Sequence, residues 1–309
     1  MPRDAYGFLS LRVADLWKSE ASDGLRKLLA ARKPDFAKDV EQAVGVTMAD
    51  IERGTVVGKG PKFSSVGILS TTKPLGRARV LKTLGLEKTE EKKLQGKTYY
   101  EEDGPGVVVF FPSDSILLIS PFAVEKVEKG AGRKYLDWTM QKRTDGALGV
   151  PLGLAAKKHH VTVALVPGFI KEMMGDVPAE FKALEPLLQA NHAAAALDFG
   201  KEGLRVETHF AFASDEQAQE GEKAAKAGLE MAKKTVAALI KKTTNEPAKD
   251  PAARKAQELQ LSFLKLLEPA SKNAAVKRQG VGVTVSLQIQ GKESANVLDL
   301  LAQYYLAAQ

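Results

Sequence analysis

The chain has 309 residues, of which 44% are hydrophobic and 27% are charged, and these proportions are typical of a folded globular protein. It contains no cysteine, which excludes disulfide bonds, thiolate zinc sites and cysteine nucleophiles. Its formal net charge is +7, from 45 basic and 38 acidic residues. The two kinds of charge are interleaved along the chain, so we expect no specific binding to nucleic acid. No apolar run reaches the roughly eighteen residues of a membrane-spanning helix, so we expect no transmembrane segment.

The first half of the chain alternates strand patterns with helix patterns. Residues 6–13 are expected to be a strand, and two helices follow: one capped by Ser22 or Asp23, and one that runs from Pro34 and stops at Gly45. The remaining apolar runs predict strands at 51–58, 63–72, 97–102, 106–112 and 115–120, and helices at 74–85, 121–130 and 132–143. The glycine- and proline-containing segment 145–153 is interpreted as a loop at a boundary.

The second half has a similar succession of patterns. Ser214 and Asp215 are expected to cap a long helix over 215–242, whose apolar stripe should cover a sheet face. The other apolar runs predict strands at 159–166, 192–200, 204–213, 273–279 and 281–290, and helices from Pro167, at 178–189, at 253–269 and at 294–308.

The order of elements in the two halves suggests an internal duplication. Residues 11–18 align with residues 164–171 at a shift of 153 residues, and twice this shift is nearly the whole length. We therefore predict an α+β fold: a duplicated unit of mostly antiparallel sheet with helices packed on one face. The expected units are residues 1–150 and 151–309, which could pack as one body. The alternative is a single mixed sheet in which the symmetry is coincidental.

The polar residues that could carry chemistry are few. His159 and His160 are adjacent and therefore point to opposite faces of a strand, so we interpret them as residues of a strand end rather than ligands of one ion. Glu207 and His209 share a face, and this spacing can form part of a metal site or arise on any half-exposed strand. These four are the only candidates, and we expect no catalytic, cofactor-binding or metal-binding residue.

Four stretches of the chain resemble uncharacterised, export-signal-bearing proteins common in planctomycete bacteria. They are "PRDAYGFLSLRVADLWKS", "DIERGTVVG", "KHHVTVALVP" and "PLLQANHAAAALDFG". This resemblance extends over most of the chain, and its motifs are strand starts and turns. A secretory leader usually precedes the corresponding start in that group, and no such signal peptide is present here. The resemblance implies a periplasmic or secreted location and no known enzyme activity, and it transfers no functional residue.

Taken together, the patterns favour a non-enzymatic binding or scaffold module of the cell envelope or secreted fraction, with an unknown protein or small ligand as its partner. The first alternative is a carrier of a small ligand or lipid, with an apolar cavity between sheet and helices. A hydrolase of unknown type is the second. A pocket of a few hundred cubic ångströms would favour the carrier.

Overall fold

The computed structural model describes residues 5–59, 64–94, 96–101, 107–120, 146–200, 203–246, 248 and 250–290. These residues form an α+β fold, as predicted, and the paired strands within it are antiparallel. Contacts divide the chain into two compact units, Met1–Trp17 with Pro34–Phe169 and Lys18–Lys33 with Ile170–Gln309. The expected boundary near residue 150 stays a prediction.

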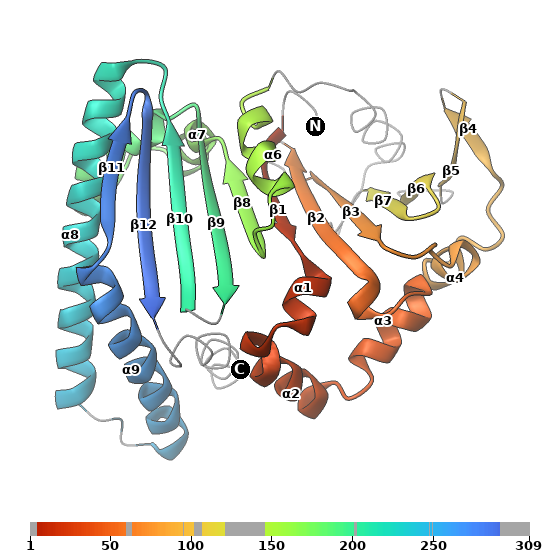
Figure 1. Cartoon of the computed structure of the whole chain (residues 1–309), viewed down its shortest axis with the longest axis horizontal. Coiled ribbons are helices and arrows are strands. Elements are labelled where there is room, and N and C mark those ends of the chain that lie inside the picture. Colours follow the sequence, from red (N-terminus) through yellow and green to blue (C-terminus); the bar gives the residue numbers. More distant parts are fainter. Residues whose placement is uncertain are drawn as a thin grey trace. The chain divides into compact units, whose positions relative to one another are not determined.

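The first unit contains eight of the described strands: β1 Ala5–Leu11, β2 Ile51–Lys59, β3 Ser64–Thr71, β4 Lys92–Leu94, β5 Lys97–Glu101, β6 Val108–Ser113, β7 Ile116–Ser120 and β8 Val161–Leu165 (Figure 1). Strand β1 lies between β2 and β8 and is antiparallel to both. Leu9 is therefore opposite Val56 on one side and Val163 on the other.

The helices of the first unit are α1 Val13–Lys18, α3 Phe36–Val44, α4 Arg77–Thr83, α6 Gly149–Ala156 and the short 3₁₀ helix η2 Met48–Asp50. The last residue of α1, Lys18, is the first residue of the second unit. Helix α3 ends at Gly45, as expected, where the backbone turns left-handed with a φ of 81°. Helices α3 and α4 cover one sheet face and share a buried cluster with it: Val46, Ile51, Leu75, Val80, Leu86, Val109, Phe111 and Leu117.

Helix α6 corrects two predictions. It occupies part of the segment that we interpreted as a loop, because its proline, Pro151, lies in the first turn, where no intrahelical donor is lost. The carbonyl oxygen of Ala155 accepts a hydrogen bond from Arg53, whose side chain lies on the sheet face opposite to that of Gly54 and α3. The first unit therefore has helices on both faces rather than on one.

The second unit contains the 3₁₀ helix η1 Glu20–Ser22, α2 Asp23–Arg32, all but the start of α7 Pro167–Met174, the 3₁₀ helix η3 Ala179–Gln189, strands β9 His192–Gly200 and β10 Gly203–Ala211, α8 Asp215–Asn245, α9 Pro251–Lys272, β11 Ala275–Gln279 and β12 Gly282–Gln290. Figure 1 shows α8 and α9 beside β11 and β12. Residues 179–189 are helical as predicted but adopt 3₁₀ geometry, with Pro186 inside.

The long helix α8 begins as predicted, because the Ser214 hydroxyl accepts a hydrogen bond from the Gln217 backbone at 3.3 Å. At Ser22 the other expected cap forms no such bond. The apolar stripe of α8 packs on one sheet face, where Ala218 and Ala225 meet Phe212 and Val283.

The internal duplication stays a prediction. In the first half, β7 of the β6–β7 hairpin returns beside β3, and in the second half, β12 of the β11–β12 hairpin returns beside β10. Strands β4 and β5, however, have no counterpart among the described residues of the second half. The helices expected at 121–130, 132–143 and 294–308 lie outside the described residues.

Candidate functional site

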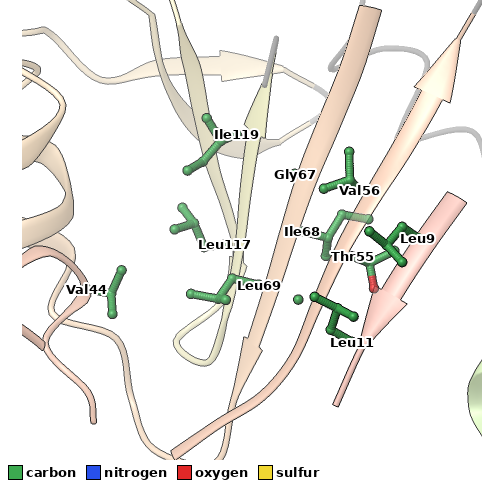
Figure 2. A pocket seen from close by; sticks show the side chains of 11 residues that line it. Leu9, Leu11, Val44, Thr55, Val56, Gly67, Ile68, Leu69, Leu117 and Ile119 are labelled. Atoms are coloured by element: carbon green, nitrogen blue, oxygen red, sulfur yellow. The ribbon is translucent and has the colours of Figure 1, made fainter. Parts of the chain in front are cut away.

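An apolar pocket of about 280 Å³ lies in the first unit, over strands β1, β2, β3 and β7 and beside the end of α3. Figure 2 shows the eleven residues that line it. They are Leu9, Leu11, Val44, Gly54, Thr55, Val56, Gly67, Ile68, Leu69, Leu117 and Ile119. None of them has a titratable side chain, so this wall offers aliphatic contacts and no acid, base or charged group.

Two glycines explain why the sheet is hollow here. Gly54 lies opposite Leu69, and Gly67 lies opposite Val56. Two of these four positions on the pocket floor therefore have no side chain. A Cβ atom added at Gly54 would have Val13 Cγ2 as its nearest neighbour, at 3.8 Å. That distance is ordinary van der Waals contact, so a Cβ atom fits at Gly54 without displacing a neighbour.

The hydroxyl group of Thr55 belongs to a polar layer beneath this floor. Side chains alternate along a strand, so Thr55 points away from the face of Gly54 and Val56. Its Oγ1 atom lies 3.0 Å from Ser10 Oγ, which also accepts a hydrogen bond from Arg53 Nη1 at 3.4 Å. Burial lowers the pKa of the Arg53 guanidinium, and the charge of Arg12 lowers it further, whereas the charges of Glu52 and Asp15 oppose the shift. The side chains that face the pocket are therefore aliphatic.

The pocket has a closed end and an open end. Leu117 is only 1% exposed and belongs to the buried cluster under α3 and α4. Leu9 is 38% exposed. In Figure 2, Val44 lies on one side of the pocket, and Leu9 and Leu11 lie on the other. A ligand would therefore enter near Leu9 and reach towards Val44 and Leu117.

The structure places His159 and His160 immediately before β8, at the strand end where we expected them. Both are half-buried. The carbonyl oxygen of His160 accepts a hydrogen bond from the Arg12 backbone at 2.8 Å, so this residue extends the pairing of β1 with β8. Neither residue lines the pocket.

Glu207 and His209 share one face of β10 in the second unit, as their spacing predicts. His209 Nδ1 lies 3.0 Å from Thr284 Oγ1, and His209 Nε2 lies 3.8 Å from Glu207 Oε2. Glu207 also accepts a hydrogen bond from Arg205. This polar row belongs to the second unit, whereas His159, His160 and the pocket belong to the first.

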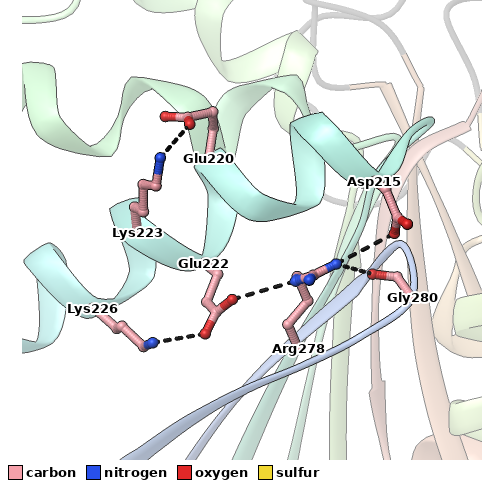
Figure 3. A network of polar contacts seen from close by, with 7 residues as sticks. All are labelled: Asp215, Glu220, Glu222, Lys223, Lys226, Arg278 and Gly280. Atoms are coloured by element: carbon pink, nitrogen blue, oxygen red, sulfur yellow. Dashed lines mark hydrogen bonds and ion pairs between the residues drawn. The ribbon is translucent and has the colours of Figure 1, made fainter.

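A second polar cluster joins α8 to the β11–β12 hairpin (Figure 3). Arg278 Nη1 lies 3.3 Å from Asp215 Oδ1, and Arg278 Nε lies 3.4 Å from Glu222 Oε2. Lys226 donates to Glu222 at 2.7 Å and is the main cause of the lowered pKa of that carboxylate. These contacts hold the hairpin against the helix.

Within the described ranges, no group of three or more acidic or histidine side chains is arranged to hold a metal ion. In the same part of the chain, no helix is both long enough and apolar enough to cross a membrane.

The sequence contained one signal for the pocket that we did not use. Glycine inside a strand often marks a close approach of a ligand or of another backbone, and both "GTVVG" and "SVGIL" carry such a glycine. The hollow itself appears only when the register brings Gly54 and Gly67 onto the same face of adjacent strands.

The chain resembles crystal structures of TP0453, an α+β protein of Treponema. Crystal form I has 11% sequence identity and a TM-score of 0.43, with 96% of this chain and 94% of that chain covered. Form III has 12% identity and a TM-score of 0.47, with 100% and 98% covered. Form IV has 10% identity and a TM-score of 0.46, with 97% and 96% covered. Comparisons with protein-family models and with curated proteins gave no match. These results assign no family and no function.

Proposed function

We propose that this protein is a non-enzymatic binding module that carries a small aliphatic ligand in the pocket of its first unit. The observation that supports the proposal is the pocket wall, which combines a volume of about 280 Å³ with aliphatic side chains and two glycines. Ligand pockets are typically concave and largely apolar. The cavity lies between the sheet and α3, which is the arrangement expected for the carrier alternative. The periplasmic or secreted location expected from the resemblance is part of the proposal.

The size of the pocket defines the class of ligand. A cavity of about 150 Å³ lined by aliphatic and aromatic side chains binds benzene, so a pocket of this volume accommodates about a dozen carbon atoms. The wall offers no polar side chain to orient a head group. The ligand is therefore an unbranched or lightly branched alkyl group, whose polar end remains outside near Leu9.

Burial of each methylene group contributes about 0.8 kcal/mol, which corresponds to about a fourfold change in the dissociation constant. In a series of straight-chain alcohols, affinity should therefore rise about fourfold per carbon and stop rising at about a dozen carbons. The series is measured by displacement of anilinonaphthalene sulfonate, whose fluorescence increases in apolar sites. An affinity that does not depend on chain length would contradict the proposal.

Filling the floor of the pocket should abolish this binding. Gly54→Val adds two methyl groups to the pocket floor, and valine suits a strand. Gly58→Val is the matched control, because Gly58 is in the same strand and on the same face but does not line the pocket. A Cβ atom at Gly58 would contact only the Gly7 carbonyl oxygen, at 3.9 Å. Equal alcohol binding by the two variants would refute the assignment of the site.

The scaffold alternative has its own supporting observation. Leu9 is 38% exposed and lies opposite Val163, so apolar surface continues from the pocket onto β8. The chain lacks cysteine, so Leu9→Cys gives a unique attachment point for a benzophenone crosslinker. Crosslinking in the source cells to one defined protein would favour a scaffold, whereas crosslinking to lipid would favour the carrier.

A further inference from the structure

We propose that Val44 sets the length of alkyl chain that the pocket accepts. This inference rests on the proposed function, because it assigns the size limit of the same site. Val44 is the only one of the eleven lining residues that comes from a helix. The other ten belong to four strands that are fixed by their pairing. The depth of the pocket therefore depends on where the end of α3 lies.

Val44 is at the closed end of the pocket. It packs against the buried cluster that contains Leu117, and Leu117 is 1% exposed. A chain that enters beside Leu9 consequently ends against the two methyl groups of Val44, on the far side of the pocket in Figure 2.

The backbone around Val44 is held firmly, so its side chain makes a fixed stop. The Val44 carbonyl oxygen accepts a hydrogen bond from the Gly76 backbone at 3.0 Å, and the Gly45 backbone donates to the Glu41 carbonyl oxygen at 2.8 Å. A Cβ atom at Gly45 would lie 2.8 Å from the Gly76 nitrogen and 2.9 Å from its Cα atom. Only glycine permits this approach, which joins the end of α3 to the residue before α4.

A fixed stop predicts a sharp limit of chain length that moves with the size of residue 44. Val44→Ala removes two methyl groups, so the limit should rise by about two carbons, and an alcohol two carbons beyond the original limit should bind about fifteenfold more tightly. Val44→Leu adds one methylene group, so the limit should fall by about one carbon. Both variants keep an aliphatic residue at the end of α3.

The test is the alcohol series, measured by displacement of anilinonaphthalene sulfonate from the full chain and from each variant. Val40→Ala is the matched control: Val40 is one turn earlier on α3 and packs on the same cluster, but it does not line the pocket. We expect the limit to move in opposite directions for Val44→Ala and Val44→Leu and to stay in place for Val40→Ala.

Two results would separate the failure of this inference from the failure of the proposed function. If the unmodified chain shows no dependence on chain length, the carrier function itself is wrong. If the unmodified chain shows a limit that Val44→Ala and Val44→Leu leave unchanged, the carrier function stands and the role of Val44 is wrong. A shift of equal size in Val40→Ala would also overturn the inference, because it would show general loosening of α3.

Discussion

Replacing Gly221 with alanine should destabilise the second unit, although alanine is normally the better helix former. Gly221 is buried in the interior of α8, where glycine costs about 1 kcal/mol relative to alanine. The added Cβ atom, however, would lie 2.2 Å from Phe212 Cζ, 2.6 Å from Cε2 and 2.9 Å from Cε1. Ordinary contact begins at about 3.4 Å, so the ring would have to move by more than an ångström.

The expected magnitude follows from these opposing effects. Overpacking a core costs about 1–3 kcal/mol, and the cost should be at the upper end here, because Phe212 is only 3% exposed and has little space to move into. The gain in helix propensity offsets about 1 kcal/mol of this cost. We therefore expect Gly221→Ala to lower the free energy of unfolding by about 2 kcal/mol.

A second glycine of α8 provides the control. A Cβ atom at Gly228 would meet only Leu184 Cδ2, at 2.9 Å, which is the end of a flexible side chain. Gly228→Ala should therefore be neutral or stabilising by up to about 1 kcal/mol. Urea unfolding followed by circular dichroism at 222 nm, with hydrogen exchange of α8 peptides, measures both variants. If Gly221→Ala were as stable as Gly228→Ala, the packing of Phe212 on Gly221 would be refuted.

Three further outcomes concern ionisable residues. Lys226→Met should raise the pKa of Glu222, since Lys226 is the main cause that lowers it. The stabilisation from this pair is present above the pKa of Glu222 in the unfolded state and is lost as the pH falls through its pKa in the folded state. Titration of the carboxylate by ¹³C NMR measures the change in pKa. Burial lowers the pKa of His192 below 6.5, so stability should fall as the pH drops from 6.5 towards the folded value, and His192→Gln should flatten the unfolding midpoint in that window. Replacing His159 and His160 together by glutamine should leave the metal content unchanged in elemental analysis and cost little stability; loss of a stoichiometric metal would contradict this.

The sequence predicted those features of the fold that depend on residues close together in the chain, such as helix ends and strands. Gly45 ends α3 in the left-handed conformation that glycine favours, and Ser214 caps α8 through its hydroxyl group. The strands of both units also follow from runs of apolar and β-branched residues. Helix α6 was missed because the glycines and Pro151 within it favour a loop, whereas the folded chain buries Pro151 and Ala155. Tertiary packing outweighed the local preference there.

The candidate site was less accessible from the sequence than the fold. The pocket requires Gly54 and Gly67 to share a face of adjacent strands, and Val44 to reach that face from a helix. Pairing register and the placement of α3 are properties of the folded chain, and no linear spacing encodes them. The histidines stood out because they are rare, and the interpretation of His159 and His160 as structural residues of a strand end stays a prediction.

The division of contacts has a consequence for how the protein can be made. The first unit takes β8 from residues beyond 150, and the second takes residues 18–33 from near the start. A gene truncated after codon 150 would encode β1 without the partner that pairs with Gly7 to Leu11, and its exposed edge would invite aggregation. During synthesis on the ribosome, likewise, β1 can pair with β8 only after about 150 further residues have been added, so most of the chain is made before either unit can fold completely.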